Sequence, residues 1–359
     1  VHPALALSLI FGAVLLLLGE LTAVPLLKLL GTKEELIDGA TIYLRIYFLG
    51  MPAMALYNFG NAVLSAAGDT RRPLLYLLIA GILNVALNLF FVIVCGMSAD
   101  GVALASILTQ YLSSVLILIA LVRTKDAYGV RPKCIRLHRD KLAPLLTLCC
   151  SAGLQNAIFA VANLFIQAGV NRFDALMVEG NSAAANADGL IYDVMAAFHT
   201  ACASFIGQNY GAGNRDRVRR TYWISLSYSF AAGAVLGLSL VFFGRGFLAL
   251  FTDSAEVAAA GMHRLRVMGF SYAISAFMDC TIAASRGLGR CVVPTIIVVL
   301  GSCVFRVIWV YTIFASVGTI ASLYLLYPVS WTLTAGAEMV YFFYLYRKVF
   351  RNPAKPATV

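Results

Sequence analysis

An uninterrupted apolar run occupies residues 73–96 and reads PLLYLLIAGILNVALNLFFVIVCG. It has no charged side chain, and about 20 apolar helical residues are enough to cross a bilayer core of about 30 Å. Outward from this run, charged residues, Gly and Pro divide the chain into similar segments. We predict ten transmembrane helices, at residues 3–30, 37–66, 73–96, 101–123, 143–170, 183–206, 221–250, 257–285, 293–316 and 320–346.

The composition supports a polytopic membrane protein. Of 359 residues, 61% are hydrophobic and 12% are charged, and the mean hydropathy is +0.84. A typical soluble domain carries about 25% charged residues, so this chain has too few charges to cover a soluble surface. Backbone in contact with lipid must satisfy its hydrogen bonds within the segment, which makes each span a helix. We therefore predict an all-α fold.

The net charge of +10 indicates orientation and not a nucleic-acid partner. Basic residues gather in every second gap between the apolar runs, and the remaining gaps carry mainly acids. Because positive loops stay in the cytoplasm, the basic gaps and the C-terminus are expected on the cytoplasmic side of the cell (inner) membrane. The basic gaps are 71–72, 123–141, 215–220, 286–290 and 347–355.

An internal repeat relates the two halves of the chain. A shift of 221 residues superimposes Leu44-Arg45-Ile46 on Leu265-Arg266-Val267, Gly68 on Gly289, and Pro73 on Pro294. The shift spans six predicted helices, an even number, so the repeats run parallel through the membrane. The second half has six helices and the first has four. The symmetry therefore predicts two more helices before Val1, twelve in all, in two six-helix bundles.

These observations give four predicted segments. Residues 1–123 form an incomplete N-terminal lobe of four helices, and residues 124–142 form a cytoplasmic linker between the lobes. Residues 143–346 form a C-terminal lobe of six helices, and residues 347–359 form a cytoplasmic tail.

Three polar turns carry a family resemblance. Residues 68–73 read GDTRRP, residues 207–214 read GQNYGAGN, and residues 286–290 read RGLGR, followed by Pro294. This set resembles the multidrug and toxic compound extrusion (MATE) family of secondary transporters. The resemblance implies two six-helix lobes with the substrate path between them, and efflux driven by a proton or sodium gradient. Some sodium-coupled members carry an acid on the seventh of twelve helices, where span 143–170 has only Gln and Asn.

Ionisable side chains within spans are functional candidates, because a charge in the bilayer core is costly. We place Asp279 first: its repeat partner is Asn58, so a polar group recurs at the same position in both halves. A carboxylate there can exchange a proton for a cationic substrate; the alternative is a structural pair with Arg306. Asp193 is a second candidate for cation coupling. Arg306 and Glu338 lie at comparable depth and are expected to form a buried ion pair, or a proton-dependent switch.

Further polar and aromatic residues are candidates for the substrate path. Amides recur three or four residues apart, which places them on one face of a helix. The alternative role for these amides is hydrogen bonding between helices. An aromatic ring can contact an organic cation, and a His side chain can carry a proton. The candidates are Asn58, Asn61, Gln155, Asn163, Tyr192 and His199.

The sequence thus predicts a secondary active transporter that exports organic cations or drug-like amphipaths by alternating access, in exchange for protons or sodium. The alternative is a lipid-linked oligosaccharide flippase of related architecture. An enzyme is not expected, because the chain has no HExxH motif and His199 is the one His clearly inside a span. We expect a monomer in the bilayer that needs no cofactor besides the coupling ion, no metal and no nucleic acid.

Overall fold

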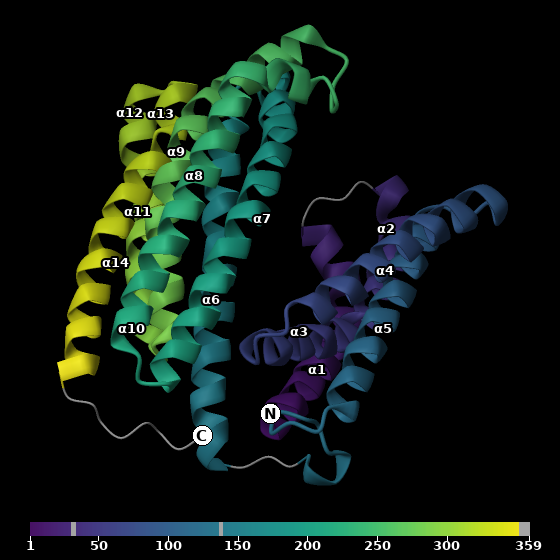
Figure 1. Ribbon diagram of the computed structural model, residues 1–359. Coiled ribbons are helices and arrows are strands. Elements are labelled where there is room, and N and C mark those ends of the chain that lie inside the picture. The colour runs from purple at the N-terminus through teal and green to yellow at the C-terminus, as the bar shows by residue number, and fades with distance from the viewer. Residues whose placement is uncertain (30–33, 136–138, 352–359) are drawn as a thin grey trace. The chain divides into compact units, whose positions relative to one another are not determined.

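The computed structural model describes residues 1–29, 34–135 and 139–351, which are helical over most of their length (Figure 1). The chain divides into two compact units, Val1–Leu145 and Leu146–Val359. The residues of the tail beyond 351, and residues 136–138 of the linker, lie outside the described part of the chain.

The first unit is built from five helices. These are α1 (His2–Leu29), α2 (Glu34–Leu49), α3 (Met51–Ala66), α4 (Arg71–Leu89) and α5 (Ala99–Arg123). A π-helical turn, η1 (Phe90–Val94), extends α4, and a short 3₁₀ turn, η2 (Pro132–Cys134), follows α5. Helices α2 and α3 meet at a bend of 42°. Pro52 lies at this bend, in the first turn of α3, where its missing N–H leaves no helical hydrogen bond unmade.

The second unit, coloured teal to yellow in Figure 1, begins with long helices. They are α6 (Arg139–Val170), whose first residues belong to the first unit, α7 (Ala175–Gly211), α8 (Arg215–Leu248) and α9 (Ala255–Gly287). A helix interrupted by π turns follows as α10 (Val292–Val298), η3 (Val299–Val304), α11 (Phe305–Trp309), η4 (Val310–Phe314) and α12 (Ala315–Val317). The last helices are α13 (Ile320–Tyr324) and α14 (Leu326–Arg351). Helix α9 packs against α7, α8 and α14 and forms the core of this unit.

The chain is an all-helical, multi-pass membrane protein. Within the described residues, eight helices are long and apolar enough to cross a membrane, or nine if the bent pair α2–α3 is one span. The tenth predicted span, 320–346, falls on α13 and α14. Helix α14 is not among the eight; it carries Glu338 and several Ser, Thr and Tyr residues. The observed helices therefore agree roughly with the predicted ten.

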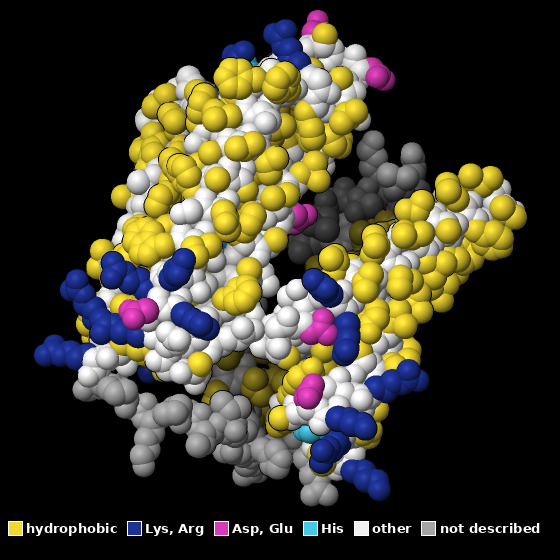
Figure 2. Space-filling view, in the orientation of Figure 1, with side chains coloured by type: hydrophobic (Ala, Val, Ile, Leu, Met, Phe, Trp, Pro, Cys, Tyr) yellow, Lys and Arg dark blue, Asp and Glu magenta, His cyan; other side chains and the backbone are white. Residues whose placement is uncertain are grey.

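The outer surfaces of both units match a lipid environment. Figure 2 shows hydrophobic side chains along the flanks of each unit, with charged side chains concentrated toward the ends of the helices. Large exposed apolar residues include Leu21, Ile93, Phe242, Phe243 and Val340, each more than two-thirds exposed. In water such surfaces would be unfavourable, whereas in lipid they are the expected exterior.

The repeat is visible in the helix boundaries. Four helix boundaries of the first unit recur 221 residues later, and Gly68 and Gly289 end equivalent helices with φ of +92° and +74°. A left-handed glycine is the usual way to end a helix. The matching boundaries are the starts of α2 and α9 (34 and 255), the ends of α3 and α9 (66 and 287), the starts of α4 and α10 (71 and 292), and the starts of α5 and α13 (99 and 320).

The packing of the helices repeats as well. A Cβ on Gly12 would lie 2.7 Å from the Cα of Pro52, and a Cβ on Gly233 would lie 3.1–3.2 Å from the backbone of Tyr272 and Ala273. Gly12 and Gly233 are 221 residues apart, as are Pro52 and Ala273. The same two helices therefore cross at the same point in each unit. The bend appears only where the crossing residue is proline.

Candidate functional site

A cavity of about 640 Å³ lies within the second unit. Residues of α6, α7, α9, α10, α11 and α14 line it, and the exposed side chain of Tyr192 marks its opening to the surface of the unit. Its wall is mixed: amides lie along one helix, aromatic rings and methionines come from others, and four ionisable residues contribute. The ionisable residues are Asp188, Arg264, Asp279 and Arg306.

Helix α6 contributes a stripe of side chains to this cavity. Gln155, Phe159, Asn163 and Gln167 follow one another at intervals of four residues, and all four line the cavity. That spacing places them on one face of the helix. The structure thus places two predicted path residues, Gln155 and Asn163, in the cavity wall.

Asp279 lines the same cavity from α9 and is half-buried. In the described part of the chain, no hydrogen bond or ion pair reaches its carboxylate. Arg286 and Arg306 attract it electrostatically without contacting it. The structural pair with Arg306, the alternative to a coupling role, is therefore not formed at ion-pair distance. Asp279 is an accessible carboxylate without a partner in the described residues.

Arg306 is held by aromatic rings. Its side chain is 3% exposed, and its guanidinium carbon lies 5.7, 4.7 and 5.9 Å from the ring centroids of Phe159, Tyr327 and Trp331. Its Nε donates to Ser330 Oγ at 3.1 Å, and its Nη2 is buried without an acceptor among the described residues. Such stacking favours the charged guanidinium.

The predicted ion pair between Arg306 and Glu338 is wrong. Both carboxylate oxygens of Glu338 are buried without a hydrogen-bond partner in the described residues. The reason is geometric: Arg306 contacts Ser330, which precedes Glu338 by eight residues, or about 12 Å along a helix. A comparable depth in the membrane, expected from the sequence, was therefore not enough to place Arg306 and Glu338 in contact.

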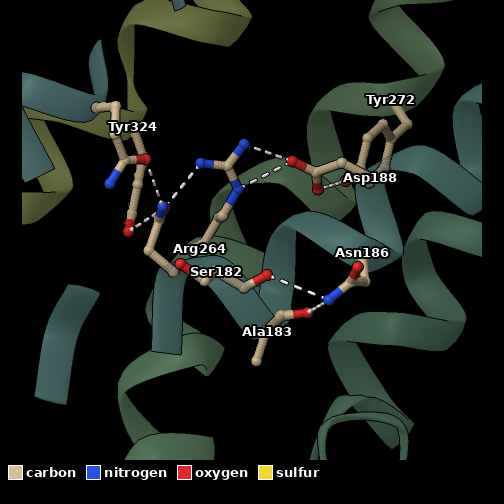
Figure 3. Close-up of polar contacts among 9 residues, drawn as sticks. Ser182, Ala183, Asn186, Asp188, Arg264, Tyr272 and Tyr324 are labelled. Carbon is tan, nitrogen blue, oxygen red and sulfur yellow. Dashed lines mark hydrogen bonds and ion pairs between the residues drawn. The ribbon is translucent and has the colours of Figure 1, made fainter. Parts of the chain in front are cut away.

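A second charged cluster in the cavity wall was not predicted (Figure 3). Arg264 of α9 donates to one oxygen of Asp188 from Nε at 2.9 Å and from Nη2 at 2.5 Å, and Tyr272 donates its hydroxyl to the other oxygen. Arg264 Nη1 also donates to Asn181 Oδ1 at 2.8 Å, and Tyr324 donates to the same oxygen at 3.0 Å. Asp188 and Arg264 lie within the predicted spans 183–206 and 257–285, which run in the same direction, and each residue is near the start of its span. This matching depth is the signal that would have paired them.

Two predicted residues of α7 lie away from the cavity wall. Asp193 is exposed on the surface of the unit and does not line the cavity, although its neighbour Tyr192 does. His199 is 9% exposed, and its Nε2 lies 3.0 Å from Ser229 Oγ of α8. The hydrogen bond gives His199 an interhelical role in the structure.

The first unit has a smaller polar cavity of its own, about 350 Å³, whose lining includes Asn84, Thr109 and Gln110. The predicted residues Asn58 and Asn61 do not line it. Asn58 is exposed on α3, and Asn61 accepts a hydrogen bond from Ser65 at 3.2 Å.

The chain matches a known family. The MatE family model matches residues 1–90 and 152–312, which is well over half of the sequence. The chain belongs to the MATE family. Both matched segments contain repeat-related turns, GDTRRP in the first and RGLGR in the second.

Relatives of this MATE protein include a probable multidrug resistance protein, YpnP, of Bacillus subtilis. The two are 31% identical over 266 residues, or 74% of this chain and 58% of YpnP. A protein named FAD transporter, from Shewanella oneidensis, is 28% identical over 263 residues, or 71% of this chain and 58% of that protein. The chain thus spans less than two thirds of the length of these relatives.

The fold is also that of a solved MOP superfamily transporter from Pyrococcus furiosus, with a TM-score of 0.90. The alignment covers 98% of this chain and 79% of that chain at 21% identity. At this identity the similarity establishes the fold alone. The roles of the cavity residues in the MATE chain must be argued from their own geometry.

Proposed function

We propose that this MATE protein is a secondary active transporter that exports small amphipathic or cationic molecules in exchange for protons or sodium ions. One observation carries the proposal: Asp279, a carboxylate without a partner in the described residues, lies in the wall of a cavity of about 640 Å³ within a membrane-spanning unit. A charge in the bilayer core is costly unless it is hydrated or paired, so such a group is a functional candidate by default.

The surroundings of Asp279 suit an exchange of cations. A proton, a sodium ion or a substrate cation can each neutralise the carboxylate, and their binding is mutually exclusive at a single acid. The rings of Tyr192 and Trp331 offer apolar and cation–π contact to an organic cation. The amide stripe of α6 supplies hydrogen-bonding groups without adding charge. We expect no bond-making chemistry in this cavity.

Orientation follows from the charge pattern of the loops. We place the basic loops and the C-terminus on the cytoplasmic side of the cell membrane, with the protein acting as a monomer. In this orientation Asp279 lies about two helical turns from the cytoplasmic end of α9, because Gly287 ends that helix eight residues later.

A second candidate function is transport of an aromatic anion. Arg306 supports it, because its guanidinium lies among three rings and no carboxylate lies within 4.0 Å of it in the described residues. The relative named FAD transporter suggests a flavin nucleotide as the compound to test. We rank this function second because Asp279 and Asp188 leave the ionisable residues of the cavity wall without a net charge. A lipid-linked oligosaccharide flippase ranks lower for the same reason.

The test is uptake by proteoliposomes that contain the full chain, with proton and sodium gradients imposed separately. Ethidium serves as the cationic probe and FAD as the anionic probe. Asp279→Asn should abolish gradient-driven ethidium uptake. The matched control is Asp193→Asn, an exposed acid on α7 outside the cavity wall, which should transport at the wild-type rate.

Wild-type ethidium uptake by Asp279→Asn would refute the coupling role. Uptake of FAD but not ethidium, lost in Arg306→Gln, would favour the second candidate. Uptake of neither probe under either gradient would contradict both.

A further inference from the structure

Glu338 on α14 is the most completely buried acid of the cavity-bearing unit. Its side chain is 0% exposed, and neither carboxylate oxygen has a hydrogen-bond partner in the described part of the chain. It does not line the cavity. A bare carboxylate in such a place is costly, whereas a protonated carboxylic acid is much less so.

The repeat shows that the fold does not require a polar side chain here. The 221-residue shift relates Glu338 to Ile117, and Ser285 to Leu64. Ile117 and Leu64 are both 0% exposed and belong to one apolar core in the first unit. In the second unit, Ser285 and Glu338 are equally buried, and the Ser285 hydroxyl also lacks a partner within the described residues. Two positions that are apolar in the core of the first unit are therefore polar in the unit that contains the cavity.

The charged neighbour of Glu338 is Arg286, at the end of α9. Arg286 attracts the Glu338 carboxylate electrostatically, and its Nε is buried without an acceptor in the described residues. Its Nη2 donates to Gln155 Oε1 at 2.8 Å, and Thr295 donates to the same oxygen at 3.4 Å. Gln155 is the first member of the amide stripe on α6. Arg286 thus attracts Glu338 electrostatically on one side and is hydrogen-bonded to the cavity wall on the other.

The elements packed against α14 carry few other groups that titrate or bear charge near this position. Helix α9 carries Asp279 and Cys280 beside Arg286, η3 carries Cys303, and α11 carries Arg306; Arg290 and Cys291 precede α10, and Tyr341 lies on α14 itself. Among these, Arg286 is the charged group that acts on Glu338.

The π-helical turn η3 lies against α14 next to this position. Ser302 of η3 lies 3.0 Å from the hydroxyl of Thr334, one turn before Glu338. The residues of α4 that correspond to η3 are regular α-helix. Single π turns within α-helices are frequent at functional sites.

We propose that Glu338 is a second proton-binding site of the transporter, separate from the cavity and linked to it through Arg286 and Gln155. The acid carries its proton in the arrangement described here, and Arg286 holds Gln155. When the O–H bond breaks, the proton passes to water, and the new carboxylate attracts the free Nε of Arg286. The hydrogen bond from Arg286 to Gln155 then breaks, and the side chain of Gln155 in the cavity wall is no longer held in place by Arg286. The link to transport rests on the function proposed for the cavity; the proton site itself does not.

Infrared difference spectroscopy of the reconstituted full chain tests the proton site directly. A protonated carboxylic acid in an apolar environment has a C=O stretching band that disappears when the pH is raised. We expect the wild-type chain to show this band near neutral pH, Asp279→Asn to retain it and Glu338→Gln to lack it. Glu338→Ile, which copies the residue of the first unit, should also lack it. A band of equal intensity in Glu338→Gln and the wild type would overturn the proposal.

Transport measurements test the link to the cavity. Glu338→Gln mimics the protonated acid at every pH, so its ethidium uptake should not change over the pH range in which the wild-type band disappears. Gln155→Leu should flatten the same part of the pH profile, and the double variant should behave like either single variant. Additive effects of the two substitutions would contradict the relay. Should Asp279→Asn transport normally, the cavity assignment fails, and the infrared result still decides the proton site.

Discussion

Arg264 donates two hydrogen bonds to a single oxygen of Asp188, from Nε at 2.9 Å and from Nη2 at 2.5 Å. The other oxygen of Asp188 accepts the hydroxyl of Tyr272. The rings of Tyr324 and Tyr327 lie 5.5 and 5.3 Å from the guanidinium carbon. This pair joins α7 to α9 and is nearly withdrawn from solvent, which makes it the main electrostatic link within the second unit.

Removing one partner of this pair should destabilise the protein strongly. Asp188→Asn leaves the Arg264 charge buried and uncompensated, and breaking a buried ion pair costs about 3–5 kcal/mol. We expect a markedly lower midpoint of thermal unfolding in detergent. The exposed variant Asp193→Asn on the same helix should unfold like the wild type. Equal midpoints for the two variants would show that the pair is not structural.

Two glycines of α8 provide a matched test of helix packing. A Cβ on Gly237 would lie 2.1 Å from the carbonyl oxygen of Gly269, whereas a Cβ on Gly246 would meet nothing within 4 Å. Both changes to Ala favour the helix by about 1 kcal/mol, so their difference isolates the contact between α8 and α9. Gly237→Ala should lower the thermal midpoint, at a cost of about 1–3 kcal/mol from overpacking. Gly246→Ala should maintain or raise it, and the reverse order would contradict this crossing.

Arg306→Gln should weaken substrate binding. The substitution removes a cation that contacts three rings of the cavity wall, each contact contributing about 0.5–2 kcal/mol. The three rings then lose the cation that holds them in place, and we expect the Kd for ethidium to rise at least severalfold. Titration with ethidium measures it, with the exposed Arg266→Gln on α9 as the control. Identical Kd values in both variants would remove Arg306 from the site.

His199→Gln should leave transport and its pH profile unchanged. Gln can donate to or accept from Ser229 as His199 does, and the position lies outside the cavity wall. A change in the pH profile of ethidium uptake would restore His199 as a proton carrier. The measurement therefore separates a structural histidine from a titrating one.

The sequence was sufficient for the fold because two strong signals agreed. Apolar runs such as residues 73–96 located the helices, and the 221-residue shift related the helix boundaries of the two halves. The bend at Pro52 needed the structure, since prolines such as Pro144 are tolerated inside a helix of this chain. Position along the chain gives the depth of a residue in the membrane.

The candidate site was harder to predict, because depth does not reveal which way a side chain faces. Asp279 was chosen from its expected depth and its repeat partner, and the structure puts it in a cavity wall. Arg306 and Glu338 were paired on depth alone. In the structure Arg306 is hydrogen-bonded to Ser330, and the Glu338 carboxylate has no hydrogen-bond partner among the described residues. Asp188 and Arg264 lie at the same depth and face each other. The direction in which each side chain faces could be learned only from the structure.

Pro52 and Ala273 are equivalent positions in the two units, and only the helix with Pro52 is bent. The interiors of the two units differ as well. The first unit has a bend between α2 and α3 and an apolar interior at Leu64 and Ile117. The second unit has an uninterrupted helix, α9, and carries Ser285 and Glu338 at the equivalent interior positions. The bend therefore lies in one unit, and the large cavity and the buried acid lie in the other.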